Sequence, residues 1–306
     1  MTGWTADRIP DQRGRLAVVT GANSGLGRTT ATELARHGAR VILAVRNVAA
    51  GEQVAREIGG DVTVRELDLA SLASVRAFAA TVDEPIDLLV NNAGLVVIGP
   101  RSTTADGFEL HLGTNMLGHF ALTGLLLPHL AAGRAPRVVS LSSITHKPAH
   151  LNFDDLMNER SYSSSRVYGE SKLATTIFGL ELHRRLTATG SPVLSVLAHP
   201  GMSRTNLTPR AWERFGIAGR VFSWLGLLVT QPVAEGALPQ LYAATAPDVR
   251  GGAFFGPSGP WEMRGRVVPV HPSKEAADPL VGKRLWSAAE TLTAVRYLSE
   301  RSVSAG

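Results

Sequence analysis

Residues 15–27 of the chain read RLAVVTGANSGLG, an apolar run that ends in a cluster of three glycines. The run predicts a short buried strand, and the pattern from about residue 25 to 37 predicts a helix that stops at Gly38. A glycine cluster between a strand and a helix is typical of a turn that binds a nucleotide phosphate, because the N–H groups that begin the helix attract an anion. An ordinary flexible turn is the alternative.

Each glycine of this cluster has a predicted role. Gly21 permits a tight turn, Gly25 lets the backbone approach a pyrophosphate, and Gly27 allows the helix to pack closely. We expect a nucleotide to contact residues throughout the turn: Gly21, Asn23, Ser24, Gly25, Leu26 and Gly27.

Beyond the glycine cluster, short apolar runs alternate with helical patterns. Further strands are predicted at about 39–45, 62–69, 86–94, 137–143, 192–201 and 251–256. Further helices are predicted at about 48–59, 71–82, 107–131, 165–189, 231–246 and 274–297. Continuous apolar strands indicate a parallel sheet buried on both faces. We therefore predict a single doubly wound α/β (Rossmann) domain over residues 1–306, with a core at about 13–297 and a sheet of about seven strands with helices on both faces.

Composition excludes several kinds of protein. The chain has no cysteine, which excludes thiol catalysis, disulfides and cysteine metal sites. Its net charge of +5 comes mostly from arginine, and no basic run is interleaved with aromatic residues, so we expect no nucleic-acid partner. His146, His150 and His199 lack metal-ligand spacing, so no metal site is predicted. No apolar run reaches the roughly 18 residues of a membrane span and the first residues are polar, so we expect a cytoplasmic protein without membrane attachment.

The end of the second predicted strand indicates the cofactor. An acidic residue at this position binds the ribose 2′-hydroxyl in NAD-binding proteins. Here the strand ends LAVRN at residues 43–47, and the first acid is Glu52 in the next helix. The guanidinium of Arg46 suits a 2′-phosphate, so NADP(H) is favoured over NAD(H). The alternative is that Arg46 is only a solvated surface residue.

Further motifs follow in a fixed order: NNAG at 91–94, SS at 142–143, YGESK at 168–172 and HPG at 199–201. Together with the glycine cluster, they resemble the classical short-chain dehydrogenase/reductase family over nearly the whole chain. The HPG and the long gap between Ser143 and Tyr168 are most similar to retinol dehydrogenase-like members and related bacterial reductases. The resemblance implies a homodimer or homotetramer, with the helices near 107–131 and 165–189 at the interface.

The resemblance also implies cofactor contacts from the ends of later strands: Asp68, Leu69, Asn92, Ala93, Gly94, Pro200, Gly201 and Thr205. The first pair is expected to flank the adenine, and NAG at 92–94 is expected beside the ribose and pyrophosphate. Residues 200–205 are expected at the nicotinamide side. The alternative for Asp68 is capping of the next helix.

Tyr168 and Lys172 are four residues apart, so they share one face of a predicted helix. A nearby ammonium is expected to lower the pKa of the phenol, which suits proton transfer to a carbonyl oxygen. The cofactor is also expected to contact both side chains. Strand alternation lets only one of the two serines face the site, and the resemblance points to Ser143, which would hydrogen-bond the substrate oxygen. The resemblance also implies that Asn115 holds a water in a proton path. The alternatives are that Asn115 kinks or caps a helix and that Tyr168 and Lys172 are surface residues.

We therefore predict an oxidoreductase that transfers a hydride between NADP(H) and a carbonyl or secondary alcohol of an apolar small molecule. The alternatives are a non-catalytic NADP(H)-binding sensor and a nucleotide-sugar epimerase or dehydratase. An insertion is predicted at about 202–230, and its apolar part at 211–229 suits a substrate lid, a subunit interface or a membrane-surface helix. His119, Phe120 and Leu122 are predicted to form a packing face of a helix.

Overall fold

The computed structural model of the chain describes residues 3–202 and 231–298. Nearly all of the predicted insertion at about 202–230 lies outside these residues, as does Thr205. The three hypotheses for the 211–229 segment therefore remain predictions.

In the described part of the chain, eight strands form one sheet. Their bounds are β1 Leu16–Thr20, β2 Arg40–Val45, β3 Val62–Glu66, β4 Leu88–Asn91, β5 Arg137–Leu141, β6 Leu194–Ala198, β7 Phe254–Pro257 and β8 Val267–Pro269. The strand order is β3-β2-β1-β4-β5-β6-β7-β8, and all neighbours are parallel except β7 and β8. The strand order reverses between β1 and β4, and ligands of such sheets bind at the carboxyl ends of the strands at this point.

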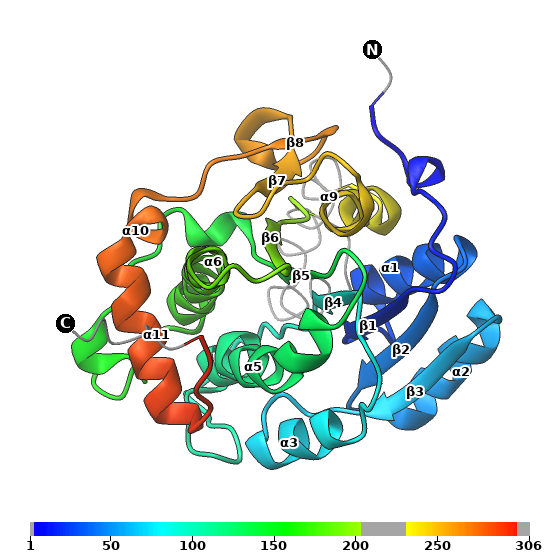
Figure 1. Cartoon of the computed structure of the whole chain (residues 1–306). Helices are drawn as coiled ribbons and strands as arrows, with labels where there is room; N and C mark the ends of the chain where they lie inside the picture. Colours follow the sequence, from blue (N-terminus) through cyan, green and yellow to red (C-terminus); the bar gives the residue numbers. More distant parts are fainter. Residues whose placement is uncertain (1–2, 203–230, 299–306) are drawn as a thin grey trace, which may run out of the picture.

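Helices cover both faces of the sheet, which confirms the predicted doubly wound fold. Their bounds are α1 Gly25–Arg36, α2 Val48–Ile58, α3 Leu72–Ala80, α4 Leu110–Leu112, α5 Gly118–Ala131, α6 Ser164–Ala188, α9 Val233–Thr245, α10 Lys274–Ala277 and α11 Pro279–Thr293. Short 3-10 turns are η1 Ala6–Arg8, η3 Ile144–His146, η4 Phe153–Asp155 and η6 Pro260–Glu262, and η2 Gly113–Leu117 is a π-helical turn. Figure 1 shows α1, α2 and α9 on one side of the sheet and α3, α5 and α6 on the other.

Side chains along β1 alternate between two hydrophobic cores, one on each face of the sheet. Leu16 and Val18 pack with residues of α3, α5 and α6, whereas Ala17 and Val19 pack with residues of α1, α2 and α9. Successive side chains of a strand point to opposite faces, so a strand covered on both sides must be apolar throughout. This explains the continuous apolar run that precedes the glycine cluster.

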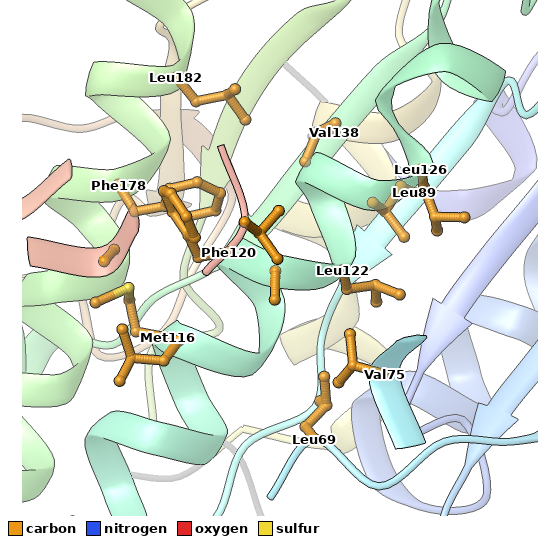
Figure 2. Packing of buried hydrophobic residues seen from close by; sticks show 14 of the residues in the cluster. Leu69, Val75, Leu89, Met116, Phe120, Leu122, Leu126, Val138, Phe178 and Leu182 are labelled. Atoms are coloured by element: carbon orange, nitrogen blue, oxygen red, sulfur yellow. The ribbon is translucent and has the colours of Figure 1, made fainter. Parts of the chain in front are cut away.

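The larger core is centred on Phe120 of α5 (Figure 2). Its ring lies 5.6 Å from the ring of Phe178 on α6 and 5.0 Å from that of Trp286 on α11. Leu122 is also fully buried, so the packing role predicted for Phe120 and Leu122 is confirmed. The same helix therefore anchors the core and carries residues toward the carboxyl edge of the sheet.

Helix α11 covers the outer side of α6, as Figure 1 shows. Every residue of α6 from Gly169 to Gly179 is buried within the chain. Trp286 is 2% exposed, and the guanidinium of Arg185 lies 4.5 Å from the centre of its ring. The chain's own C-terminal helix thus packs against one side of α6, and the predicted use of the helices near 107–131 and 165–189 as a subunit interface stays a prediction.

Three elements differ from the sequence prediction. The sheet has an eighth strand, β8, which pairs antiparallel with β7. The helix predicted at 274–297 is two helices, because Pro279 starts α11 and Asp278 caps it through the N–H of Leu280. The helix predicted at 107–131 begins at Leu110 and includes the π-helical turn at 113–117.

Candidate active site

The glycine turn is tightly wound against the end of β4. Gly21 and Gly25 have φ angles of +64° and +53°, which favour glycine. A Cβ on Gly27 would lie 2.4 Å from Asn92 Nδ2 and 2.5 Å from the Gly21 carbonyl oxygen. Ser24 is the N-cap of α1, but its side chain makes no capping hydrogen bond. The first N–H groups of α1 are therefore available to an anion at the carboxyl edge of the sheet.

A buried histidine holds the turn against the next strand. The hydroxyl of Thr20 accepts the N–H groups of Asn92 and Ala93 at 3.0 and 2.8 Å, and lies 2.9 Å from His119 Nε2. His119 Nδ1 lies 3.0 Å from the Asn115 carbonyl oxygen and donates to it. Burial lowers the pKa of His119 to about 4, so the ring is neutral and its Nε2 accepts from Thr20. His119 was predicted to be a packing residue, and it is buried, but it also joins the turn to the Asn115 segment.

The residues predicted near the adenine lie at the ends of β2 and β3. Arg46 is exposed directly after β2, and Asn47 caps α2 by accepting the N–H of Ala50. Asp68 is partly buried and its carboxylate accepts the N–H of Ala70 at 2.9 Å. Ser71, rather than Asp68, is the N-cap of α3.

Leu69, predicted beside Asp68, belongs to the hydrophobic core and is 6% exposed (Figure 2). A Cβ on Gly118 of α5 would lie 3.1 Å from its Cβ. Its side chain therefore packs toward α5.

Tyr168 and Lys172 lie on one side of α6, next to the end of β5. Lys172 is 5% exposed, and its Nζ donates to the Leu141 carbonyl oxygen at 2.9 Å. The Ser142 hydroxyl is buried 2.7 Å from the Thr176 hydroxyl, inside the core. Ser143, one residue later, is partly buried and lies beside Tyr168. Strand alternation therefore places Ser143, and not Ser142, beside the phenol.

Burial dominates the pKa values of this pair. It raises the pKa of Tyr168 above its ordinary value, and the hydrogen bond with Ser143 offsets only part of the rise. Burial also lowers the pKa of Lys172 to about 8. The sequence prediction that the ammonium lowers the pKa of Tyr168 is therefore wrong for the chain alone. The physical reason is that burial removes water from the phenolate, while the ammonium is bound to the Leu141 carbonyl.

Asn115 lies in the π-helical turn and holds the loop after β4. Its Oδ1 accepts the Leu95 N–H at 2.9 Å, and its Nδ2 donates to the Leu95 carbonyl at 3.2 Å and to the Ser171 hydroxyl at 2.9 Å. A Cβ on Gly94 would lie 3.2 Å from Lys172 Nζ and 3.5 Å from Asn115 Oδ1. The structure thus brings Asn115, Gly94 and Lys172 together, and π-helical turns are frequent at functional sites.

The predicted contact residues after β6 are joined to two other loops. Gly201 has a φ of +61°, and its N–H donates to His199 Nδ1 at 3.2 Å. His199 Nε2 donates to one carboxylate oxygen of Glu262 at 2.9 Å, and Lys147 pairs with the other. Pro200 is partly buried between His199 and Gly201. Glu262 therefore links the loops that follow β5, β6 and β7.

A family model described as short chain dehydrogenase matches residues 15–214. The chain belongs to the short-chain dehydrogenase family. Human retinol dehydrogenase 13 is 42% identical over 306 residues, which cover 94% of this chain and 87% of that protein. Mouse polyprenol dehydrogenase is 42% identical over 301 residues, which cover 93% of this chain and 85% of that protein. The crystal structure of an uncharacterized protein from Mycobacterium paratuberculosis is 45% identical with a TM-score of 0.82, and covers 97% of this chain and 99% of that chain.

Short-chain dehydrogenases are oxidoreductases that bind a nicotinamide cofactor, and the residues of this chain fit one. Gly27 lets the start of α1 lie close to Asn92, and the N–H groups at the start of a helix are the groups that bind a pyrophosphate. In residues 3–202 and 231–298, no group of three or more histidine, aspartate or glutamate side chains is arranged to hold a metal. Over the same ranges, no helix has the length and apolar character to cross a membrane.

Two buried residues of this short-chain dehydrogenase were missed by the sequence analysis. Glu109 and His111 are both 0% exposed, and the ring of His111 lies 6.2 Å from that of Tyr168. The only sequence signal is a charged residue in the apolar segment GFELHL at 107–112. Polar residues in an apolar pattern are rarely buried without a partner, so this signal points to a hydrogen-bonded pair.

Proposed function

We propose that this chain is an NADP(H)-dependent oxidoreductase that interconverts a carbonyl and a secondary alcohol in an apolar small molecule. One observation carries the proposal. Tyr168, Ser143 and Lys172 lie together at the carboxyl edge of the sheet that also carries the glycine turn. A hydrogen-bonding phenol and hydroxyl beside a nicotinamide site are the groups that carbonyl reduction needs.

In the proposed reaction the chain transfers a proton and the cofactor transfers a hydride. A bound nicotinamide supplies or accepts the hydride. Tyr168 donates the proton of its hydroxyl to the substrate oxygen as negative charge develops there, and takes it back in alcohol oxidation. Its raised pKa keeps it protonated at neutral pH, ready to donate. Ser143 hydrogen-bonds the same oxygen. Lys172 and Asn115 belong to the path along which a proton returns to Tyr168.

The charge at the end of β2 supports NADP(H). Arg28, the other arginine near the glycine turn, is paired with Glu57 at 2.6 Å. Arg46 is exposed and pairs with no carboxylate among residues 3–202 and 231–298. An unpaired guanidinium suits a 2′-phosphate, and no carboxylate stands at the end of β2 itself to bind a 2′-hydroxyl.

Replacing Arg46 with aspartate tests the cofactor choice. A charge-assisted hydrogen bond contributes about 1.5–3 kcal/mol, so Arg46→Asp is expected to weaken NADPH binding by about 10- to 100-fold. NADH binding should be unchanged or improved, because a carboxylate can accept from the 2′-hydroxyl. Arg56→Asp, an exposed arginine of α2, is the matched control. Equal losses in the two variants, or unchanged NADPH binding in Arg46→Asp, would contradict the assignment.

Apolar side chains beside the site support an apolar substrate. Val97 and Ile98, in the loop that Asn115 holds, are 39% and 59% exposed, and Trp261 next to Glu262 is 82% exposed. Two relatives are named for apolar alcohols, retinol and polyprenol. A panel of ketones and aldehydes with NADPH, ordered by apolar chain length, tests this part of the proposal. Turnover that rises with chain length supports it, and turnover limited to polar carbonyls contradicts it.

A further inference from the structure

Glu109 and His111 form a hydrogen-bonded pair next to Tyr168. His111 Nδ1 lies 3.0 Å from Glu109 Oε1, and the Leu112 N–H donates to Glu109 Oε2 at 2.8 Å. The Tyr162 hydroxyl lies 3.4 Å from Oε1. Burial raises the pKa of Glu109, but the hydrogen bonds from His111 and Leu112 outweigh it, and the pKa stays below its ordinary value. Glu109 is therefore a buried carboxylate, and each of its two oxygens accepts a hydrogen bond.

The other side of His111 faces the site. Its Nε2 accepts the Val97 N–H at 3.0 Å, so the proton of the ring is on Nδ1. The ring meets that of Tyr168 edge to face, at 6.2 Å and 67°. Val97 lies two residues beyond Leu95, which Asn115 binds through its side chain. Asn115 thus holds the loop after β4 at Leu95, and His111 holds it at Val97. His111 is the one of the two whose ring also contacts the phenol ring of Tyr168.

We propose that Glu109 and His111 are a positioning pair, in which Glu109 fixes the Nδ1–H tautomer of His111 so that His111 holds both Tyr168 and the loop at Val97. This proposal deepens the proposed function and rests on it for the rate measurement. A carboxylate can accept from both the imidazole and the Leu112 N–H, whereas an amide side chain can accept from only one side. The opposite tautomer would turn an Nε2–H toward the Val97 N–H, two donors that repel each other.

The tautomer of His111 tests the geometry without any turnover. The imidazole signals of ¹⁵N-labelled protein can be assigned by their loss in His111→Gln. The proposal predicts the Nδ1–H tautomer in the native protein and its loss in Glu109→Gln. An Nε2–H tautomer in the native protein, or an unchanged tautomer in Glu109→Gln, would overturn it, whatever the enzyme does.

The rate of hydride transfer tests the function of the pair. In Glu109→Gln, single-turnover reduction at saturating NADPH should slow by about 10- to 100-fold, because the phenol and loop are misplaced. NADPH affinity should stay within about twofold, and the double variant with His111→Gln should lose no more than the worse single variant. A rate equal to that of the native protein, or a parallel loss of NADPH affinity, would refute the positioning role.

Glu181→Gln is the matched control, since Glu181 is also a buried glutamate and is bonded to Arg184 and Arg185. It should lower the melting temperature but not the hydride-transfer rate, so an equal loss of rate in both variants would reduce Glu109 to a stabilising residue. If the native protein reduces no carbonyl, the proposed function fails, and the tautomer measurement still decides whether the pair exists.

Discussion

Lys172 shows what the candidate site costs in stability. It is 5% exposed, and burial lowers its pKa from 10.5 to about 8. The shift corresponds to about 3 kcal/mol of lost stability while the group is charged. The unfolded chain binds more protons than the folded one between pH 8 and 10.5, so this penalty disappears as the pH rises through that window.

Replacing Lys172 with methionine is therefore expected to stabilise the protein. At pH 7 the substitution removes the buried charge but leaves the Leu141 carbonyl without its donor, so the net gain is about 1–2 kcal/mol and the melting temperature rises by about 2–4 °C. The gain should shrink toward pH 10. Thermal melts at both pH values, with exposed Lys274→Met as the control, measure it. A less stable variant at pH 7, or a difference independent of pH, would contradict the burial argument.

Residue-scale predictions succeeded where the spacing alone settles the geometry. Tyr168 and Lys172 share one face of α6, as their spacing predicts. Alternation along β5 separates Ser142 from Ser143, but the choice of Ser143 rested on the family resemblance. The pKa of Tyr168 could not be predicted, because it depends on burial by residues distant in the sequence. The surroundings of Glu109 and His111 could not be predicted for the same reason, since their partners Tyr162 and Val97 come from other segments.

At the scale of elements, the turn into α1 depends on the missing side chain of Gly27. Gly27→Ala should destabilise the protein by about 1–3 kcal/mol, because the new Cβ would overlap Asn92 and Gly21. It should also weaken NADPH binding at least about tenfold, since the turn must open. Gly60→Ala is the control. Its φ of +71° strains an alanine and lowers stability, but no atom lies within 4 Å of the added Cβ, so NADPH binding should not change. Unchanged NADPH binding in Gly27→Ala would show that the turn does not hold the cofactor.

Most elements could be predicted because apolar periodicity determines them. The exceptions have local causes. Strand β8 has three residues and one neighbour, so it carries too little pattern to detect. Pro279 was visible in the sequence, but the periodicity across it continues, which hid the break before α11. The π-helical turn at 113–117, which contains Asn115, is buried throughout and reads in the sequence as part of an ordinary helix.

At the scale of the whole molecule, α11 completes the core on the α6 side. Trp286 and Tyr297 pack 4.8 Å apart and both contact Phe120. Arg185 donates to the Leu298 carbonyl at 3.1 Å, which fastens the end of the described chain to α6. The predicted sheet and layers follow from the alternation of strands and helices, but no local pattern says where a final helix docks. We therefore expect any self-association to use a face other than the outer side of α6.

Hydrogen exchange tests this packing. Amides of α6 between Gly169 and Gly179 should be protected equally at low and high protein concentration, because the chain itself covers them. Trp286→Ala should speed their exchange and cost about 3–5 kcal/mol, while Leu280→Ala, 76% exposed on the same helix, should do neither. Protection that grows with protein concentration would mean that a second subunit covers α6.

The central claim is that Tyr168 transfers the proton in an NADP(H)-dependent carbonyl reduction. The most direct measurement compares the native protein with Tyr168→Phe, following NADPH binding and the turnover of apolar ketones and aldehydes on the same samples. We expect turnover in the native protein and a loss of about 10²- to 10⁴-fold in Tyr168→Phe, with NADPH affinity retained. Turnover that survives in Tyr168→Phe, or a native protein that binds NADPH and reduces none of the carbonyls, would contradict the account.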